Sequence, residues 1–337
     1  MSADGADPLA AEQVDALFAP LLGAETLLIA ASGGPDSTAL LVMAAEWAAR
    51  RGARLAAATV DHRLRPESAA EAETVAALSA KLGVPHKALV WTGAKPTTRV
   101  QERAREARYR LLIEHARAIG ADAIATAHHA DDQAETVLFR LIRGSGVAGL
   151  RGMEAISRRD GVTIARPLLG VAKRDLVAFC RSRGIEFADD PSNANPRFAR
   201  PRLRALLDRL GEEGLNAEGL VRLALRAAEA DEALERMTAD VEARLGADGP
   251  IEARDLFAEP IAIIQRTLAR RIGKTGGRDE SRIGLEKIEA LALRLRDALA
   301  KQHAFSANVG GALVRLSAKG SLSFAPEPPR KGESRGQ

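Results

Sequence analysis

The sequence predicts an α/β domain with a parallel sheet, followed by a smaller, mainly helical domain. Short apolar runs alternate with amphipathic stretches of helical length through the first half of the 337 residues. The glycine-containing and polar segments of that half follow the apolar runs, which is where ligands bind to parallel sheets. After about residue 211 the alternation stops, and amphipathic stretches with helical spacing follow.

In the first half, an opening helix should be followed by four pairs of a strand and a helix. The opening helix covers residues 7–22, with Pro8 at its start. The strands are expected at residues 27–31, 54–60, 88–91 and 123–126, and the helices that follow them at 37–51, 68–82, 100–119 and 131–143. Strands that alternate with helices make parallel βαβ units, in which helices cover both faces of the sheet.

The second half should be mainly helical. A linker is indicated by Gly211, Gly214 and Gly219, and helices are expected at 220–245, 255–272 and 281–301. Residues 304–324 resemble a small hairpin that turns near Gly310-Gly311 or Lys319-Gly320. The expected domains are therefore residues 1–211, residues 212–325, and a disordered polar tail at 326–337.

Composition excludes several classes of protein. Cys180 is the only cysteine, which rules out an internal disulfide, a CxxC redox pair and a cysteine-cluster zinc site. No apolar run is long enough to span a bilayer, and the first residues carry acidic rather than basic side chains. We therefore expect a cytoplasmic protein with no membrane association.

Arginine outnumbers lysine and gathers at residues 99–117, 140–183 and 197–209, although the net charge is only +4. Guanidinium groups bind phosphate through two hydrogen bonds and stack on bases, so these segments could form a nucleic-acid surface. They could equally lie on solvated helix faces. Composition leaves both interpretations open.

Six residues between the first expected strand and its helix predict a phosphate site: Ser32, Gly33, Gly34, Pro35, Asp36 and Ser37. Glycines let the backbone approach a ligand closely, and the first N–H groups of the following helix attract anions. The segment lacks the Lys-Ser/Thr ending of a Walker A motif, which disfavours simple transfer of a γ-phosphate.

Asp36 is unusual in an anion site because its carboxylate would repel phosphate, unless it holds Mg²⁺ or transfers a proton. The alternative is an ordinary Gly-Gly turn in which Asp36 or Ser37 caps the helix. A Gly-Gly pair alone would favour that turn. All six residues between a strand and a helix favour nucleotide binding instead.

A second polar segment, at residues 128–136, opens the helix after the fourth expected strand with the sequence His-His-Ala-Asp-Asp-Gln-Ala-Glu-Thr. Asp131 and Glu135 lie four residues apart on one helical face, so their carboxylates could contact one cation. Alternatively, Asp131 or Asp132 caps the helix and the histidines are structural. Adjacent acids beside a nucleotide site fit Mg²⁺, whereas His129 could serve either role.

The pattern Ser-Gly-Gly-x-Asp-Ser resembles the signature of the PP-loop, or N-type, ATP pyrophosphatase family. From residue 27 to about residue 209, the chain is similar to the tRNA(Ile)-lysidine synthases within that family. The similarity rests on residues 61–65, 128–136, 143–146, 149–150 and 166–169, and on Ala104, Arg105, Arg108, Tyr109, Asp190, Ser192, Asn193, Arg200 and Arg204. Asn195 and Pro201 depart from the family pattern, which usually has Asp and Asn there.

This resemblance implies a PP-loop fold, of the adenine nucleotide α-hydrolase type, and a reaction in two steps. ATP is cleaved between its α- and β-phosphates, and AMP is attached to the C2 oxygen of the wobble cytidine in the CAU anticodon of an isoleucine tRNA. Free L-lysine then attacks C2 through its ε-amine, which displaces AMP and forms lysidine. The implied cofactors are ATP and Mg²⁺, and the protein is expected to be a monomer or homodimer.

The resemblance also implies roles for individual residues. The expected catalytic residues are Asp36, Asp131 and Asp132. ATP is expected at residues 32–37, Asp61 and His62, and Mg²⁺ at Asp36, Asp132 and Glu135. The tRNA and lysine are expected at Arg105, Arg108, His129, Arg143, Asp190, Asn193, Arg200 and Arg204, and the helical domain from residue 212 is expected to bind tRNA.

Other functions fit the sequence less well. PP-loop thiolases move sulfur through cysteine pairs or an iron–sulfur cluster, for which a single cysteine is not enough. Amidotransferase relatives need an ammonia-supplying module, which no segment here resembles. A non-catalytic protein that binds nucleotide or tRNA has no need of the four acidic residues Asp36, Asp131, Asp132 and Glu135. Release of pyrophosphate would distinguish an enzyme from such a protein.

Overall fold

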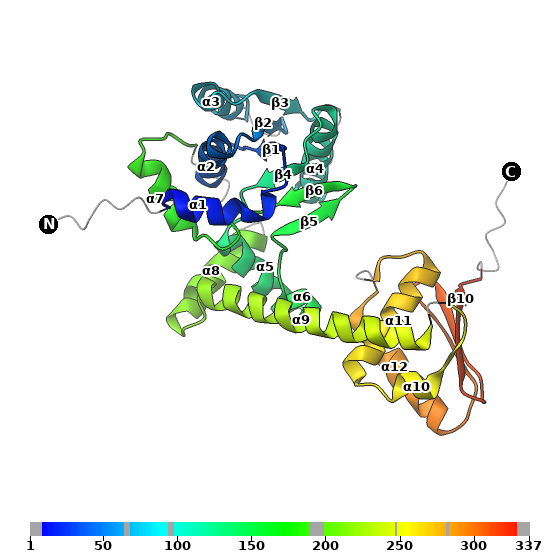
Figure 1. Ribbon diagram of the computed structural model, residues 1–337. Helices are drawn as coiled ribbons and strands as arrows, with labels where there is room; N and C mark the ends of the chain where they lie inside the picture. Colours follow the sequence, from blue (N-terminus) through cyan, green and yellow to red (C-terminus); the bar gives the residue numbers. More distant parts are fainter. Residues whose placement is uncertain are drawn as a thin grey trace. The chain divides into compact units, whose positions relative to one another are not determined.

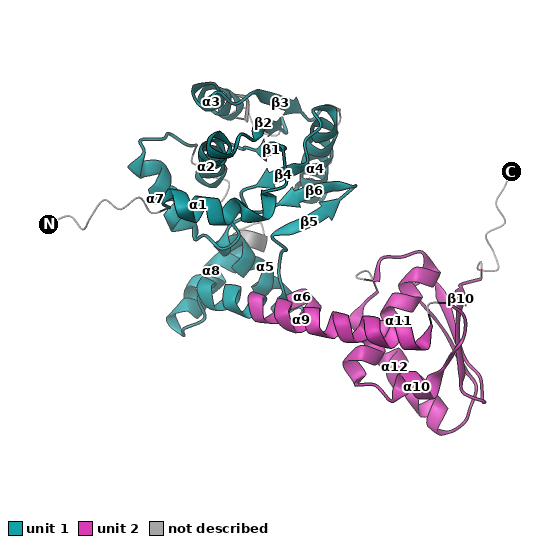
Figure 2. Cartoon of the chain, in the orientation of Figure 1, with its two compact units in different colours: residues 1–143, 151–224 teal, residues 144–150, 225–337 magenta. Residues whose placement is uncertain are grey.

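The computed structural model of the chain describes residues 9–63, 68–93, 98–188, 199–246, 248–280 and 283–328 (Figure 1). It divides into two compact units, of which the first comprises residues 1–143 and 151–224 and the second residues 144–150 and 225–337 (Figure 2). The division falls inside the long helix α9 (Ala217–Leu245). The first residues of α9 therefore belong to the first unit.

The first unit contains a six-stranded sheet in the order β3-β2-β1-β4-β6-β5. Its strands are β1 (Thr26–Ala30), β2 (Arg54–Asp61), β3 (His86–Val90), β4 (Ala123–Thr126), β5 (Ile156–Arg159) and β6 (Val162–Ala165). All neighbouring pairs are parallel except β5 and β6, which are antiparallel. This arrangement confirms the predicted α/β fold.

The hairpin of β5 and β6 was not among the expected elements. Its turn is Asp160-Gly161, and both residues have positive φ, 49° and 80°. An Asp-Gly pair suits this turn because glycine and aspartate tolerate positive φ better than other residues. The strands themselves are only four residues long and include two arginines, so their hydrophobic pattern is weak.

Helices cover both faces of this sheet. The first unit contains, besides the start of α9, the helices α1 (Ala11–Phe18), the 3-10 turn η1 (Ala19–Leu21), α2 (Pro35–Arg51), α3 (Ser68–Lys81), α4 (Val100–Ala118), α5 (Ala130–Ile142), α7 (Lys173–Ser182) and α8 (Ala199–Glu212). Side chains of β1 alternate between the faces: Leu27 and Ile29 pack with residues of α2 and α7, whereas Leu28 packs with residues of α4. Because helices pack on both faces of the sheet, a buried parallel strand needs apolar residues on both of its sides.

A smaller apolar cluster joins α5 to the helices that follow the sheet. Ala134, Val137 and Leu138 of α5 pack against leucines of α8 and against Leu220 and Ala224 of α9. Gly214, with a φ of 93°, lies in the short turn between α8 and α9. The start of α9 is therefore part of the core of the first unit.

The second unit combines helices with a four-stranded antiparallel sheet in the order β7-β10-β9-β8. The strands are β7 (Ile251–Glu252), β8 (Phe305–Val309), β9 (Ala312–Leu316) and β10 (Ser321–Pro326), and the helices besides α9 are α6 (Val147–Leu150), α10 (Ala253–Phe257), α11 (Ile261–Gly276) and α12 (Leu285–Ala300). Both candidate turns are used, at Gly310-Gly311 and around Gly320. The expected single hairpin is thus part of a larger sheet. The tail expected at residues 326–337 begins inside β10, and residues 329–337 lie outside the described residues.

Ion pairs join α9 and α11 within the second unit. Arg266 pairs with Asp231, and Arg270 pairs with Glu242 at 2.8 Å. The arginines of α11 therefore have structural partners. No helix in the described residues is long and apolar enough to cross a membrane.

Candidate active site

The site lies where the carboxyl ends of β1 and β4 adjoin. The chain leaves β1 towards β2 on one side of the sheet and returns to β4 on the other side. The loops after β1 and β4 consequently diverge and leave room for a ligand. Both polar segments identified in the sequence begin in these two loops and continue into the helices α2 and α5.

The loop after β1 is shaped by Gly33 and closed by two serines. Gly33 has a φ of 90°, which a side chain would strain. The Ser32 N–H donates to Ser37 Oγ at 3.0 Å, and this oxygen in turn donates to the Gly34 carbonyl at 3.1 Å. Ser37 therefore holds the turn at the start of α2, although no side chain caps this helix, and the first N–H groups of the helix stay available to an anion.

Two features of this loop indicate that it receives a ligand. A Cβ built on Gly34 meets no atom within 4 Å, so open space lies beside the backbone there. The Oδ1 atom of Asp36 is buried and accepts no hydrogen bond from the described residues. A buried carboxylate oxygen without a partner is costly unless a cation or donor reaches it.

Three carboxylates surround His129 at the start of α5. The Nε2 atom of His129 lies 3.5 Å from Asp36 Oδ2 and 3.5 Å from Asp132 Oδ2, and its Nδ1 atom lies 3.5 Å from Asp131 Oδ2. Burial by itself lowers the pKa of His129, but these carboxylates outweigh it and raise the pKa to about 9. The imidazole is therefore protonated at neutral pH and compensates part of the acidic charge.

Asp131 and Asp132 also hold the backbone. Asp131 accepts a hydrogen bond from the Lys173 N–H at 2.9 Å, which joins α5 to α7. The hydrogen bond with His129 lowers the pKa of Asp131 to about 2 against the opposing effect of burial, and the Lys173 N–H adds to it. Asp132 accepts from the His129 N–H at 3.3 Å, so the capping interpretation of this residue also describes part of what it does.

Glu135 has a different partner. Its buried carboxylate forms an ion pair with Arg204 of α8. It was expected to share a cation with Asp36 and Asp132. Among the described residues, no group of three His, Cys, Asp or Glu side chains could hold a metal ion. Two carboxylates, Asp36 and Asp132, do converge, and Mg²⁺ bound with a nucleotide often takes only one or two carboxylates besides phosphate oxygens. The donor set therefore fits Mg²⁺ together with a phosphate ligand.

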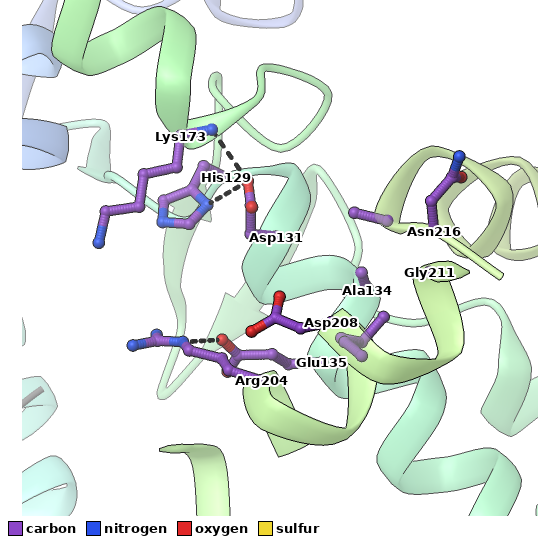
Figure 3. A pocket seen from close by; sticks show the side chains of 11 residues that line it. His129, Asp131, Ala134, Glu135, Lys173, Arg204, Asp208, Gly211 and Asn216 are labelled. Atoms are coloured by element: carbon purple, nitrogen blue, oxygen red, sulfur yellow. Dashed lines mark hydrogen bonds and ion pairs between the residues drawn. The ribbon is translucent and has the colours of Figure 1, made fainter. Parts of the chain in front are cut away.

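A pocket of about 420 Å³ opens beside this cluster (Figure 3). Its walls come from α5, α7, α8 and the start of α9, and it is lined by His129, Asp131, Ala134, Glu135, Lys173, Arg204, Leu207, Asp208, Gly211, Asn216 and Ala217. Acidic and basic side chains both line it. Such a pocket suits a ligand that carries charges of both signs.

Two of the charged residues that line the pocket, Lys173 and Asp208, were not identified from the sequence. Lys173 meets Asp131 across 42 positions of sequence, which no local spacing reveals. Asp208 lies in α8, for which no helix was predicted. The sequence did contain one indication of Asp208. It lies four residues after Arg204, and residues at this spacing share one face of a helix.

The other sequence-predicted residues are placed as follows. Asp61 ends β2 and accepts from the Arg63 N–H at 2.8 Å, and the ring of His62 meets Trp91 edge-on. On α4, the Arg105 guanidinium lies 5.2 Å from the ring centre of Tyr109, and burial lowers the pKa of Arg108. The guanidinium of exposed Arg143 lies 4.0 Å from the ring centre of Phe139.

Asp190, Asn193 and Asn195 lie outside the described residues, and the side chains of Arg200 and Pro201 are not described either. The roles expected for Asp190, Asn193 and Arg200 therefore stay predictions. Arg204, from the same family pattern, lies in the described part of the chain and lines the pocket.

Comparisons with known proteins agree with this geometry. The PP-loop domain family matches residues 7–210. The tRNA(Ile)-lysidine synthase of Rhodopseudomonas palustris is 46% identical, with 99% of this chain and 100% of that protein covered. The tRNA(Ile)-lysidine synthase of Methylobacterium nodulans is 48% identical, with 90% and 91% covered.

Among solved structures, the U34-tRNA thiolase NcsA from Methanococcus maripaludis, with its 4Fe-4S cluster, has a TM-score of 0.56 at 17% identity. That likeness covers 65% of this chain and 78% of the thiolase and concerns the fold alone. The high identity over nearly the whole length of the two synthases is more specific. The chain belongs to the PP-loop family and, within it, to the family of the tRNA(Ile)-lysidine synthases.

Proposed function

We propose that this protein is a tRNA(Ile)-lysidine synthase, a ligase that uses ATP to join free lysine to the wobble cytidine of the isoleucine tRNA with a CAU anticodon. The observation that carries this proposal is the meeting of the loop after β1 with the acidic start of α5 at one switch point of the sheet. The loop suits pyrophosphate, and the acidic residues suit the ion that accompanies it. We expect the protein to act in the cytoplasm as a monomer or homodimer.

In the first step, the C2 oxygen of the cytidine attacks the α-phosphorus of ATP, and the bond from that phosphorus to the oxygen bridging to the β-phosphate breaks. The Ser32 hydroxyl and the first N–H groups of α2, including that of Ser37, would hold the departing pyrophosphate. The ribose and adenine would extend towards Asp61 and His62, which follow the neighbouring strand β2. The cytidine would approach from the side of β4.

Asp36 and Asp132 are the residues that we propose for Mg²⁺, with Glu135 as the third expected ligand only if it separates from Arg204. The ion would offset the charge that develops on pyrophosphate. Asp131 acts as a positioning residue, because its carboxylate holds both His129 and the start of α7.

In the second step, the lysine ε-amine attacks C2, the bond from C2 to the adenylated oxygen breaks, and AMP leaves while the amine gives up its protons. We place free lysine in the pocket beside His129. Its carboxylate would meet Lys173 or Arg204, and its ammonium groups would meet Glu135 or Asp208, since all four residues line the pocket. The mixture of charges supports an amino acid with an extra cationic group.

Binding of the tRNA is assigned to two regions. Arg105, Arg108 and Arg143 would contact phosphates or bases near the anticodon, together with Asp190, Asn193 and Arg200. The helical domain, expected from residue 212 to residue 325, would hold the body of the tRNA. Phosphate contacts of this kind position an RNA without reading its sequence.

The direct test is to incubate the protein with ATP, labelled lysine, and either the isoleucine or the methionine tRNA that has a CAU anticodon. Label should enter only the isoleucine tRNA, with release of pyrophosphate. Asp36→Asn should abolish both signals, whereas Asp15→Asn, which removes the ion pairs of Asp15 with Arg50 and Arg51, should not. Pyrophosphate release without lysine transfer would indicate another tRNA-modifying reaction, and no release at all would indicate a binding protein.

A further inference from the structure

His128 has no role in the reaction described above, yet its ring is held in one orientation. Its Nδ1 atom lies 2.9 Å from Thr126 Oγ1, and this hydroxyl donates its hydrogen to the Ala165 carbonyl at 3.3 Å. Because a threonine hydroxyl has one hydrogen, Thr126 must accept from His128 Nδ1. The neutral ring therefore carries its hydrogen on Nδ1, and Nε2 presents a lone pair.

The surroundings keep this ring neutral. Burial lowers the pKa of His128 to about 3 against the attraction of Asp132, and the nearby guanidinium groups of Arg105, Arg166 and Arg108 lower it further. Within the described part of the chain, Nε2 has no hydrogen-bond partner. At neutral pH this nitrogen is consequently available as a hydrogen-bond acceptor.

The location of His128 follows from the alternation of β4. Ile124 packs on the α4 side of the sheet, whereas Ala123, Ala125 and Ala127 pack on the opposite side with α2 and α7. The same alternation directs His129 towards Asp36 of α2 and His128 towards the arginines of α4. The acceptor thus lies beside β4, whereas the proposed adenosine site lies beside β2, on the other side of β1.

We propose that His128 Nε2 accepts a hydrogen bond from the exocyclic N4 amino group of the target cytosine and so selects cytidine over uridine. This inference rests on the proposed function. Cytosine presents a donor at position 4, whereas uracil presents a carbonyl oxygen, and a carbonyl facing Nε2 would set two acceptors against each other. A site that leaves a buried polar group unpaired rejects the wrong ligand strongly.

Pyrimidin-2-one tests the proposal at the level of one group, because it keeps the C2 oxygen of cytosine and lacks the amino group. An anticodon stem-loop or full tRNA with this base at the wobble position should react with the wild-type protein with kcat/KM lowered by about 10- to 100-fold relative to cytidine. In His128→Ala, the two substrates should react at nearly equal rates. His86→Ala is the matched control, since His86 Nε2 also pairs with a threonine, Thr59, at 2.9 Å, but at the amino end of β3. The His86→Ala variant should keep the wild-type ratio of kcat/KM between the cytidine and pyrimidin-2-one substrates.

Thr126→Val tests the orientation of the ring, because valine has a similar shape and removes the hydroxyl that accepts from Nδ1. The ratio between the two bases should shrink while the reaction on cytidine continues, which a purely structural role would not produce. Adenine of ATP also carries an exocyclic amine, so a parallel series replaces ATP with the triphosphate of purine riboside.

The proposal is overturned if wild type does not discriminate between cytosine and pyrimidin-2-one, or if His128→Ala keeps the wild-type ratio. It is also overturned if His128→Ala abolishes discrimination between ATP and the purine analogue instead. The wild-type measurement decides even if a variant fails to fold. Formation of lysidine by wild type on cytidine checks the proposed function separately.

Discussion

At the scale of single residues, two adjacent histidines differ in charge: one is cationic and the other is neutral. His129 is cationic because three carboxylates outweigh its burial, with a pKa of about 9, whereas burial among arginines leaves His128 neutral, with a pKa of about 3. Neither the residue type nor its position in sequence determines this difference. It follows from which face of β4 each side chain reaches.

The two glycines of the loop after β1 should respond differently to a methyl group. Gly34→Ala should leave the free energy of unfolding nearly unchanged, because residue 34 has a φ of −73° and nothing lies within 4 Å of a Cβ there. It should lower ATP affinity by about tenfold or more, ~1.4 kcal/mol, because the methyl group enters the space proposed for phosphate. Gly33→Ala should cost about 1–2 kcal/mol of stability, because its φ is 90°. Urea unfolding and ATP titration measure the two effects, and equal ATP affinity in wild type and Gly34→Ala would contradict the phosphate assignment.

The acidic cluster should be sensitive to magnesium through Asp132. Asp132→Asn keeps an oxygen that can cap α5 but removes a charge from the proposed Mg²⁺ site. The magnesium concentration for half-maximal pyrophosphate release should rise about 10- to 100-fold. Glu135→Gln should change it much less, because Arg204 already holds that carboxylate. An unchanged magnesium titration in Asp132→Asn would contradict the assignment of this residue to Mg²⁺.

At the scale of elements, α5 connects the parts of the site. Its first turn carries the acidic residues, its buried side joins α8 and α9, and Gln133 holds the following loop through hydrogen bonds with the Met153 backbone at 2.7 and 3.0 Å. Gly152 is required there, since a Cβ would lie 2.6 Å from Gln133 Oε1. One helix therefore positions the residues that we propose as catalytic together with residues of the pocket and of the loop.

The ion pair between α5 and α8 should stabilise the first unit. The Glu135 side chain is only 4% exposed, so Arg204→Met would leave a buried carboxylate without its partner. We expect a loss of about 2–3 kcal/mol in the free energy of unfolding, measured with urea. The double variant Arg204→Met, Glu135→Gln should recover part of that loss, while Arg209→Met, at an exposed position of the same helix, should have little effect. Additive effects of the two single changes would show that the pair is not coupled.

At the scale of the whole molecule, the chain has two units, and we propose that they divide the work between chemistry and tRNA binding. A truncation after residue 211 would remove Leu220 and Ala224, which are buried in the first unit. A chain that ends at residue 224 keeps them and is the better test of this division.

The protein truncated after residue 224 should bind ATP with near-normal affinity and lose most of its affinity for tRNA. In the full-length protein, the logarithm of tRNA affinity should fall linearly with the logarithm of salt concentration, by about 0.7 per single-stranded phosphate contact. Filter binding at several salt concentrations measures the affinity for tRNA, and ATP titration measures the affinity for ATP. Near-normal tRNA affinity in the truncated protein would assign RNA binding to the first unit instead.

The sequence by itself determined the class of fold and the chemical type of the site. Strand β4 was predicted with the bounds that it has, and all four of its residues are buried. Helices α2, α4 and α5 were predicted within two residues at each end, because long periodic segments report which face is buried. The loop at residues 32–37 could be identified because its function depends on local backbone geometry. Short strands such as β5 and β6, with few apolar residues, left a weaker signal, although their Asp-Gly turn was readable.

Only the tertiary structure decided which side chains meet. It paired Glu135 with Arg204, although the helical spacing had suggested a shared cation with Asp131, and it brought Lys173 to Asp131. It also separated His128 from His129 onto opposite faces of the sheet. The physical reason is that pairing across helices depends on how distant segments pack, whereas sequence spacing reports only neighbours along one helix or strand.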